Sequence, residues 1–208
     1  MDSVHRRLHS EAVAFREERL LDGPDLRLAT ITTGTSPGVI SVLRDRMLQG
    51  FQDFGVAPDS HPQACMAIEE ALANAVFHGN LELDSKLKED GSSQFLELGR
   101  SRAAAEPWCS RQVMVIELAT PFGLWLTIAD QGGGFDVCKA LQRPTDPEEL
   151  LASGRGLVMM QAFADDLIFN SQGNEVTLVF YSRGNQEIRE LLRERARARA
   201  TAGPKSLF

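Results

Sequence analysis

Three short motifs in a fixed order constrain this chain more than any other feature of its sequence. The first, EALANAVFHGN at residues 70–80, puts a carboxylate and a carboxamide one helical turn apart. The second, DQGGGFD at residues 130–136, is an acid at the end of an apolar run, followed at once by glycines. The third, SGRGL at residues 153–157, is a glycine turn before an apolar segment. Each motif alone is a weak signal, and their order and context carry the inference.

Composition excludes several classes of function. The chain has 208 residues, of which 43% are hydrophobic, and this suits one domain with extensions. Its formal net charge of -7 argues against general affinity for nucleic acid or anionic membranes. No stretch approaches the ~18 apolar residues of a membrane span, and the N-terminus lacks the apolar region of a signal peptide. The cysteines are odd in number and share no metal-ligand spacing, so we expect reduced thiols in a cytoplasmic protein.

The pattern of charge and turn residues divides the chain into three parts. Residues 1–25 form a charged N-terminal extension, in which we expect a short helix and a loop. Residues 26–182 form the domain, interrupted by a polar insertion at 81–112 and a loop at 136–153 that is rich in helix breakers. Residues 183–208 form a charged tail. We assign no chemistry to the insertion.

Apolar periodicity predicts the main elements of the domain. Strands are expected at residues 27–33, 113–119 and 124–130, and a terminal hairpin is expected from 166–170 and 175–181.

The same reasoning predicts three helices, at residues 36–54, 60–79 and 156–163. The first is expected to begin with Ser36 as its N-cap and Pro37 in its first turn. The second opens on a capping-box pattern at residues 60–63.

The helix at 60–79 carries a row of polar side chains. Glu70, Asn74 and His78 stand at i, i+4 and i+8, so they line one face beside the apolar stripe. Glu69 competes with Glu70 but lies at a different angle around the helix. A solvated polar face is the ordinary interpretation of such a helix, and the glycine motifs downstream favour a lined cavity instead.

Asp130 ends an otherwise apolar, inward-facing row of the strand at 124–130. A carboxylate there is costly unless it has a partner. Gly132 and Gly134 then allow the backbone to turn. The ordinary alternative is an aspartate at a strand end that is the N-cap of a helix or turn.

The third motif places Gly154, Arg155 and Gly156 at the start of a helix, where free N–H groups favour phosphate. A Walker loop is the rival phosphate site, but the pattern GxxxxGK[ST] is absent, and Lys139 is wrongly spaced after the glycines.

Together the motifs resemble the nucleotide site of the GHKL ATPases, the group of gyrase, the heat-shock chaperone, histidine kinases and MutL. The resemblance covers roughly residues 27–181. It implies a Bergerat-type α+β fold, a two-layer α/β sandwich with helices on one face of a mixed β-sheet and the nucleotide between the layers. It also implies ATP and Mg²⁺ as cofactors. Asn74 would ligate the metal, Glu70 would be the general base, and Asp130 would accept a hydrogen bond from the adenine amino group.

The resemblance extends to the other residues of the motifs, with residues 136–153 as the ATP lid. The residues expected at the nucleotide are Asn74, His78, Asp130, Gly132, Gly134, Gly154, Arg155, Gly156 and Asn174. One departure is the pair Gly173-Asn174, which stands where much of the superfamily has Gly-Thr. An asparagine can make a similar hydrogen bond to the adenine.

The spacing best resembles the stand-alone anti-sigma-factor serine/threonine kinases. That resemblance implies a kinase that phosphorylates an antagonist protein and sequesters a sigma factor, as a homodimer through residues 27–33 and the following helix. A histidine kinase would need a dimerising helical hairpin, which 25 residues are too few to build. The alternative is a nucleotide-gated protein-binding module without phosphoryl transfer, which the insertion at 81–112 favours.

Overall fold

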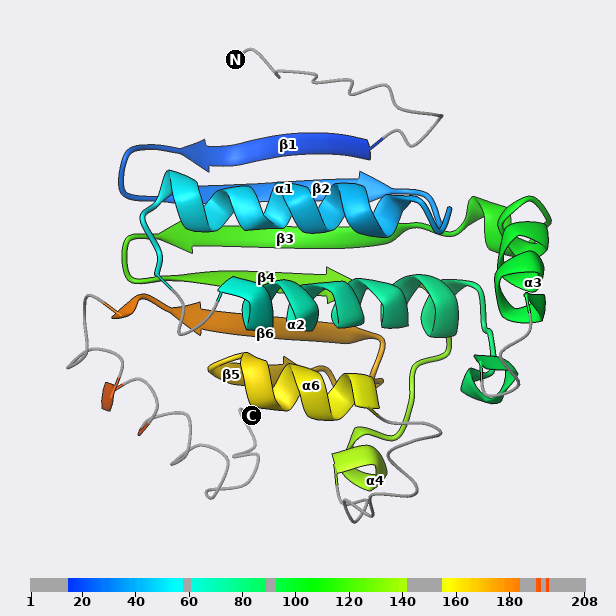
Figure 1. The fold of residues 1–208 in the computed structure, drawn as a ribbon. Helices are drawn as coiled ribbons and strands as arrows, with labels where there is room; N and C mark the ends of the chain where they lie inside the picture. The colour runs from blue at the N-terminus through cyan, green and yellow to red at the C-terminus, as the bar shows by residue number, and fades with distance from the viewer. Residues whose placement is uncertain are drawn as a thin grey trace, which may run out of the picture.

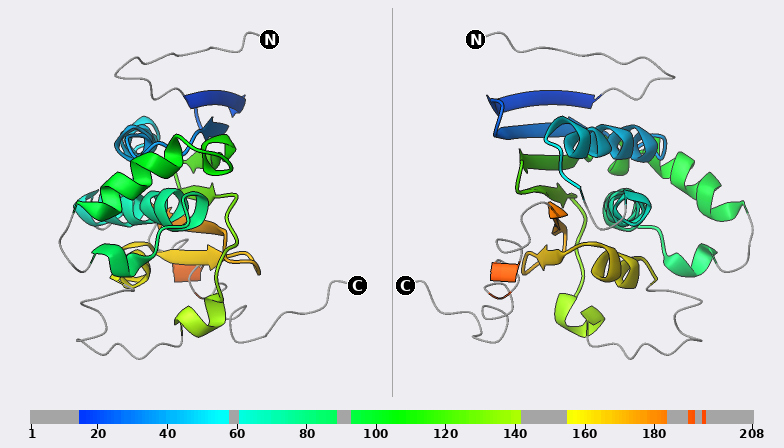
Figure 2. Two further views of the ribbon diagram at one scale, coloured as in Figure 1. Left: turned by 90° about the vertical axis from the view of Figure 1, so that its right-hand side faces the viewer. Right: turned by 60° about the vertical axis from the view of Figure 1, so that its left-hand side comes forward.

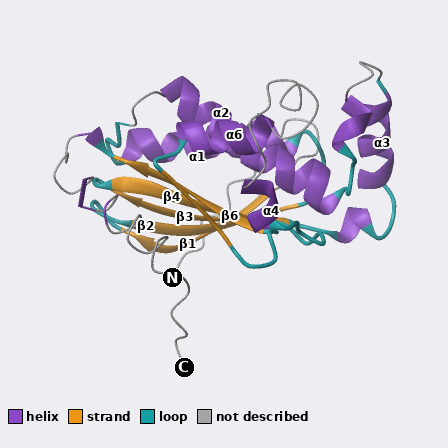
Figure 3. Ribbon diagram, turned by 90° about the horizontal axis from the view of Figure 1, so that it is seen from below, coloured by secondary structure: helices purple, strands orange, loops and turns teal. Residues whose placement is uncertain are grey.

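A six-stranded sheet forms one layer of the structure, and helices cover one of its faces (Figure 1). The view along the sheet in Figure 3 separates the two layers, with α1, α2 and α6 together on the same side. The protein is therefore an α+β two-layer sandwich, as the sequence predicts. The computed structural model describes residues 15–57, 61–88, 93–141, 155–183, 190–191 and 194.

The strands pair in the order β1-β2-β3-β4-β6-β5, and every pairing is antiparallel. The sheet is thus antiparallel throughout rather than mixed. The long connection after β2 reverses the chain, and the one after β4 leads to β5, which is parallel to β4 but is separated from it by β6. The strands are β1 (Phe15–Asp22), β2 (Arg27–Thr33), β3 (Val113–Thr120), β4 (Gly123–Ala129), β5 (Asp166–Phe169) and β6 (Glu175–Tyr181).

Three helices form the second layer, and α3 lies beyond one end of the sheet (Figures 1 and 2). Within the described part of the chain, no helix is long and apolar enough to cross a membrane. The helical segments are α1 (Val39–Asp53), α2 (His61–Ala73), η1 (Asn74–Asn80), η2 (Ser85–Lys88), α3 (Gln94–Ala103), η3 (Trp108–Ser110), α4 (Val137–Leu141) and α6 (Arg155–Phe163).

The core lies between the two layers, because alternate residues of each central strand point toward the helices. Burial alternates along β3 in this way, and the inward residues are completely or almost completely buried. Those of β4, such as Leu126, pack with Met47 of α1 and Leu72 of α2. Periodicity therefore predicts these strands correctly.

The first strand is a correction to the sequence analysis. Residues 15–22, expected as a helix in a separate extension, form the edge strand β1 of the same sheet. The charged sequence of β1 lacks apolar alternation, so its pattern does not indicate a strand. It pairs with β2 and joins an ion network instead. The predictions for residues 1–14, for Ser60 and for most of the tail beyond Arg183 fall outside the described residues.

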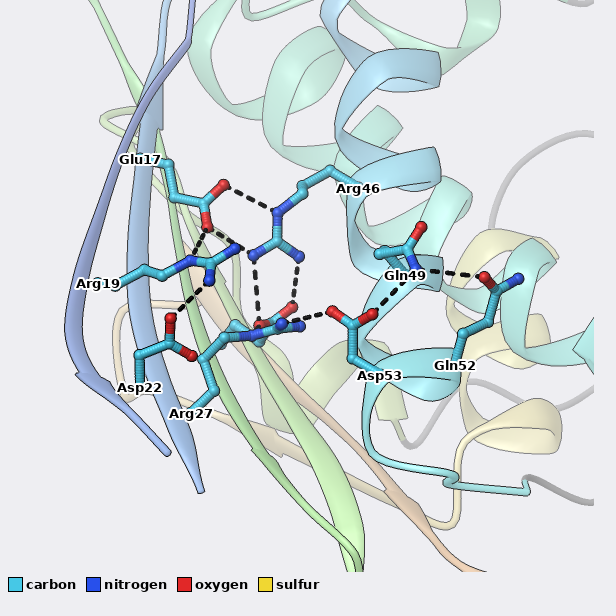
Figure 4. A network of polar contacts seen from close by, with 9 residues as sticks. Glu17, Arg19, Asp22, Arg27, Arg46, Gln49, Gln52 and Asp53 are labelled. Atoms are coloured by element: carbon cyan, nitrogen blue, oxygen red, sulfur yellow. Dashed lines mark hydrogen bonds and ion pairs between the residues drawn. The ribbon is translucent and has the colours of Figure 1, made fainter. Parts of the chain in front are cut away.

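That ion network ties β1, β2, β3 and α1 together (Figure 4). Arg46 of α1 bridges Glu17 of β1, at 2.7 Å, and Glu117 of β3, at 3.0 Å. Glu117 is fully buried and also accepts a hydrogen bond from Nε of Arg27, whose Nη1 pairs with Asp53. Because each buried charge has a partner of opposite sign, the network fixes the register of the edge strand against the first helix.

The start of α1 also differs from its prediction. The helix begins at Val39, with Gly38 as the N-cap residue and no side-chain cap. Ser36 contributes its backbone carbonyl, which accepts a hydrogen bond from the Val39 N–H at 2.9 Å. A turn through Pro37 therefore replaces the expected capped first turn.

The helix expected at 60–79 changes character in its middle. The α-helical part ends at Ala73, and residues Asn74–Asn80 form a π-helix. The N–H of Leu81 accordingly donates to the carbonyl of Val76, five residues back, at 2.9 Å. Such wide turns are rare and often lie at functional sites.

Candidate functional site

The first and third motifs meet where α2 passes the start of α6. Glu70 and Asn74 lie on α2, and Gly156 is the second residue of α6. A Cβ atom added to Gly156 would lie 2.6 Å from Oε2 of Glu70 and 3.5 Å from Nδ2 of Asn74. Only glycine therefore lets α6 approach this polar face without displacing it.

The structure separates Glu70 from its competitor. Glu69 is exposed and pairs with Arg44 of α1, at 3.0 Å, on the side of α2 that faces away from α6. Glu70 is half-buried and faces Gly156. Of the two adjacent carboxylates, Glu70 is the one at the junction of the motifs.

His78 contacts residues of the insertion. Its Nδ1 lies 2.7 Å from the carbonyl oxygen of Leu83, and its ring lies near that of Phe95 in α3. His78 lies within the π-helix, and its contact with the nucleotide stays a prediction.

The first and second motifs meet at Asp130, directly after β4. A Cβ atom added to Gly79 would overlap the Asp130 carboxylate, and one added to Gly132 would overlap the Gly79 carbonyl. The N–H of Gly132 donates to Oδ1 of Asp130 at 2.8 Å. The Asp130 carboxylate is thus enclosed by backbone atoms of the end of the π-helix and of the glycine turn.

Burial raises the pKa of Asp130 to about 6, although the hydrogen bond from Gly132 and the charge of Arg111 act in the opposite direction. A carboxylate held in this way has lost much of its water without gaining a strong charge partner. A neutral N–H donor from a ligand would satisfy it. This property matches the adenine amino group expected from the resemblance.

The turn after Asp130 is joined to the β5–β6 hairpin. Gly134 and Gly173 both have positive φ, of 72° and 77°, and a Cβ atom on either would collide with the backbone of the other segment. The Phe135 N–H donates to the Gln172 carbonyl at 3.1 Å. Glycine at these two positions therefore allows the turn after Asp130 and the turn of the β5–β6 hairpin to come into backbone contact.

Asn174 lies beside Asp130, but its side chain is engaged by the protein. Its Nδ2 donates to the carbonyl of Asp130 at 3.2 Å, and its Oδ1 accepts from Asn170 at 2.8 Å. Its own backbone carbonyl accepts from the Asp130 N–H at 2.9 Å. Asn174 thus braces the strand end that carries Asp130, and its contact with adenine stays a prediction.

Two residues at the site were missed by the sequence analysis. Asn80 is fully buried, and its Oδ1 accepts from the N–H of Gln131 at 2.7 Å. Arg111 donates from Nη1 to the Asn80 carbonyl at 2.7 Å. Asn80 is the last residue of the first motif, and its position there is the signal that could have identified it. No local pattern marks Arg111, because the contact depends on how the insertion returns.

The remaining predicted residues are described only in part. Gly154 and the side chain of Arg155 fall outside the described residues, although Arg155 begins α6. Of the expected lid, residues 136–141 are described, and they include the short helix α4 rather than only loop. The N–H of Lys139 donates to Oδ1 of Asp136 there at 2.9 Å.

The donor set at the α2–α6 junction is oxygen-rich. Within the described residues, no group of three or more His, Cys, Asp or Glu side chains is placed to hold a metal ion. Glu70 and Asn74 instead offer a carboxylate and a carboxamide side by side. Such a pair fits a hard cation that keeps several waters and takes its other ligands from phosphate.

Comparison with known proteins agrees with this geometry. A family model described as the histidine kinase-like ATPase domain matches residues 37–180, which is more than half of the chain. The matched region contains all three motifs and runs from the turn before α1 to Phe180 in β6. No curated protein matches the chain.

Proposed function

We propose a function for this chain on the premise that it belongs to the histidine kinase-like ATPase domain family. The family implies ATP binding. The finer proposal is that the protein binds ATP with Mg²⁺ and acts as an anti-sigma-factor-type serine/threonine kinase. It would phosphorylate an antagonist protein and sequester a sigma factor, in the cytoplasm.

The observation that carries this proposal is the way the motifs pack into one another. Gly79 fits against Asp130 at one end of the π-helix, and Gly156 fits against Glu70 and Asn74 at its other end. Asp130, a possible hydrogen-bond acceptor for adenine, therefore lies at the Gly79 end of the continuous helix formed by α2 and the π-helix. Glu70 and Asn74, possible oxygen ligands for a metal ion, lie farther back on the same helix, where it meets α6. This arrangement suits a nucleotide laid along that helix.

The residues at the α6 end could support phosphoryl transfer. The hydroxyl oxygen of a serine or threonine would form a bond to the γ-phosphorus, the bond from that phosphorus to ADP would break, and Glu70 would take the hydroxyl proton. Mg²⁺, when bound, would neutralise charge on the phosphates. Asn74 would hold it through its carboxamide oxygen.

The proposed homodimer needs a different route from the one expected. Strand β2 pairs on both sides, with β1 and with β3, so neither of its edges is available to a second copy. Among the described strands, β1 and β5 lie at the two edges of the sheet. A dimer on the first side of the sheet would use β1 and α1.

A nucleotide-gated binding module is the second candidate, and one observation favours it. Within the insertion, Arg102 donates to the carbonyls of Leu81 and Glu82, both at 2.7 Å, and these two residues directly follow the π-helix. A partner bound to the insertion would therefore contact a segment continuous with the site. This candidate needs no phosphoryl transfer.

The test uses labelled ATP, Mg²⁺ and candidate antagonist proteins. Glu70→Gln keeps volume and hydrogen-bonding reach but removes the base, so transfer should fall by roughly 10²- to 10⁴-fold while nucleotide binding persists. Glu69→Gln is the matched control, because Glu69 pairs with Arg44 and should leave transfer unchanged. Equal loss in both variants would contradict the role of Glu70. ATP binding without transfer to any partner would leave the binding module as the function.

A further inference from the structure

We infer that Arg111 is a positioning residue of the nucleotide site, through which the 81–112 insertion holds the strand end that presents Asp130. The inference rests on the proposed nucleotide function and goes beyond it, since it gives the insertion a part in the site. Its basis is a closed ring of hydrogen bonds.

The ring has three side chains, each bonded to the backbone of the next. Nη1 of Arg111 donates to the Asn80 carbonyl at 2.7 Å. Oδ1 of Asn80 accepts from the Gln131 N–H at 2.7 Å. Oε1 of Gln131 accepts from the N–H of Gln112, the residue after Arg111, at 2.8 Å. The ring therefore joins the end of the insertion, the end of the π-helix and the residue after Asp130.

The position of the ring puts it next to the carboxylate. Gly79, which abuts Asp130, directly precedes Asn80. Gln131 directly follows Asp130. Asn80 is fully buried, and its Nδ2 has no hydrogen-bond partner among the described residues. Burying an amide with one unbonded atom costs folding free energy. We infer that Asn80 is placed here for the hydrogen bond that its oxygen accepts from Gln131.

Arg111 also acts on Asp130 through its charge. It is the cation that opposes the effect of burial on the pKa of Asp130. Its Nη2 pairs with Glu82 at 2.7 Å, and this carboxylate is partly exposed. The other charged or titratable groups around the ring are Arg102, which bonds the Leu81 and Glu82 carbonyls, and His78, whose Nδ1 lies at the Leu83 carbonyl.

Arg102 provides a matched control. It belongs to the same insertion, bonds the same segment and stacks on Trp108, with its Cζ 4.8 Å from the ring centroid. It is outside the hydrogen-bonded ring, and its charge is not among the influences on Asp130. If only the packing of the insertion matters, replacing either arginine should have the same effect. If Arg111 positions Asp130, only the replacement of Arg111 should affect Asp130.

The experiment measures the Asp130 pKa by carbon NMR in the nucleotide-free chain, and ADP affinity by calorimetry between pH 5.5 and 8. In Arg111→Gln we expect the pKa to rise above its value of about 6 and ADP binding near neutral pH to weaken roughly tenfold. Arg111→Lys keeps the charge but loses the guanidinium fork, so it should restore the pKa while affinity stays reduced. Arg102→Gln should change neither quantity.

Two outcomes would overturn the inference. One is an unchanged Asp130 pKa together with unchanged ADP affinity in a folded Arg111→Gln protein. The other is an equal effect of Arg102→Gln. If Arg111→Gln does not fold, Arg111→Lys decides, since unchanged ADP affinity in that variant contradicts the role of the ring. A wild-type chain that takes no ADP would contradict the proposed function, and the titration of Asp130 would still decide the role of Arg111.

Discussion

The ionised carboxylate of Asp130, which the proposed site uses as a hydrogen-bond acceptor, lowers the stability of the fold. Its pKa is raised by burial from 3.8 to about 6, so the folded protein resists ionising it. The charge therefore costs stability, and this cost appears as the pH rises from about 4 through about 6. The cost is absent at lower pH, where the group is protonated in both the folded and unfolded states.

Asp130→Asn should accordingly stabilise the nucleotide-free protein while it weakens nucleotide binding. The asparagine keeps the shape and the Gly132 contact but removes the buried charge. The variant's melting temperature should exceed that of the wild type above pH 6, and the difference should shrink toward pH 4. ADP affinity should fall about 10- to 150-fold, the usual range for a hydrogen bond to a charged group. Thermal unfolding across this pH range, with calorimetry at pH 7.5, checks both; a variant less stable at every pH would contradict the origin assigned to the pKa.

The glycines of the second motif differ sharply in what surrounds them. A Cβ atom on Gly132 would overlap the Gly79 carbonyl, whereas one on Gly133 would meet no atom within 4 Å. Gly132→Ala should therefore lower stability by ~1–3 kcal/mol and impair nucleotide binding, because backbone must move. Gly133→Ala should leave both close to wild type. Chemical denaturation and ADP titration of the pair measure this, and similar behaviour of the two variants would show that the close approach is unimportant.

The individual residues differ in how visible they are from sequence. Asp130 could be predicted as special because it ends an apolar row, and glycines next to an acid indicate close approach. Asn80 could be identified only by its place in the first motif, and Arg111 could not be assigned at all, since their contacts span 51 and 31 residues of sequence.

Among the elements, β1 depends on charge more than on apolar packing. The hydrogen bond from Arg46, helped by its charge and by Arg19, holds the pKa of Glu17 at about 2 against the opposing effect of burial. The stability that this lowered pKa contributes is present above about pH 4.5 and is lost as the pH falls through about 2. The edge strand should therefore be the first part of the sheet to respond to acid.

Glu17→Gln should loosen β1 selectively. Without the carboxylate, Arg46 loses one of its two partners, and the amides of β1 should exchange hydrogen faster while those of β3 and β4 keep their protection. Glu18→Gln is the control, because Glu18 points to solvent and pairs only at 3.9 Å with Arg16. Hydrogen exchange at pH 7 compares them, and equal rates in both variants would contradict the proposed role of the ion network.

The elements were predicted to different degrees. The central strands and the terminal hairpin follow from alternation, because one of their faces is buried against helices. β1 could not be recognised, because its partners are ions on other elements. The π-helix could not be predicted either, since side-chain periodicity over seven residues does not separate it from an α-helix.

At the scale of the whole molecule, nucleotide should link the two helices that flank the expected lid. α4, at the start of the expected lid, lies after the turn that carries Asp130, and α6 begins beside Glu70. ATP with Mg²⁺ should slow hydrogen exchange in both, and should raise stability by about 2.7 kcal/mol at a concentration of 100 Kd. Equal exchange with and without ligand would mean that these helices have no part in binding.

The two-layer architecture could be predicted from the motifs, but the arrangement of the insertion could not. Residues 81–112 are polar and irregular, so their composition indicates a surface loop. In the structure, Arg111 joins the end of this segment to Asn80. Arg102, Trp108 and Arg111 also join it to the segment's own first residues, Leu81 and Glu82. Such contacts are set by tertiary geometry, which no local pattern records.

The wide turn at Asn74–Asn80 has a consequence for how chain length can vary in evolution. Its hydrogen bonds span five residues, so the turn holds one residue more than an α-helix would use. Losing a single residue here would let the helix close into an ordinary α-helical turn with its backbone still bonded. The same loss would rotate Gly79 and Asn80 by about 100° around the axis, away from Asp130 and Gln131. We therefore expect a one-residue deletion here to give a chain that unfolds cooperatively but takes up no ADP.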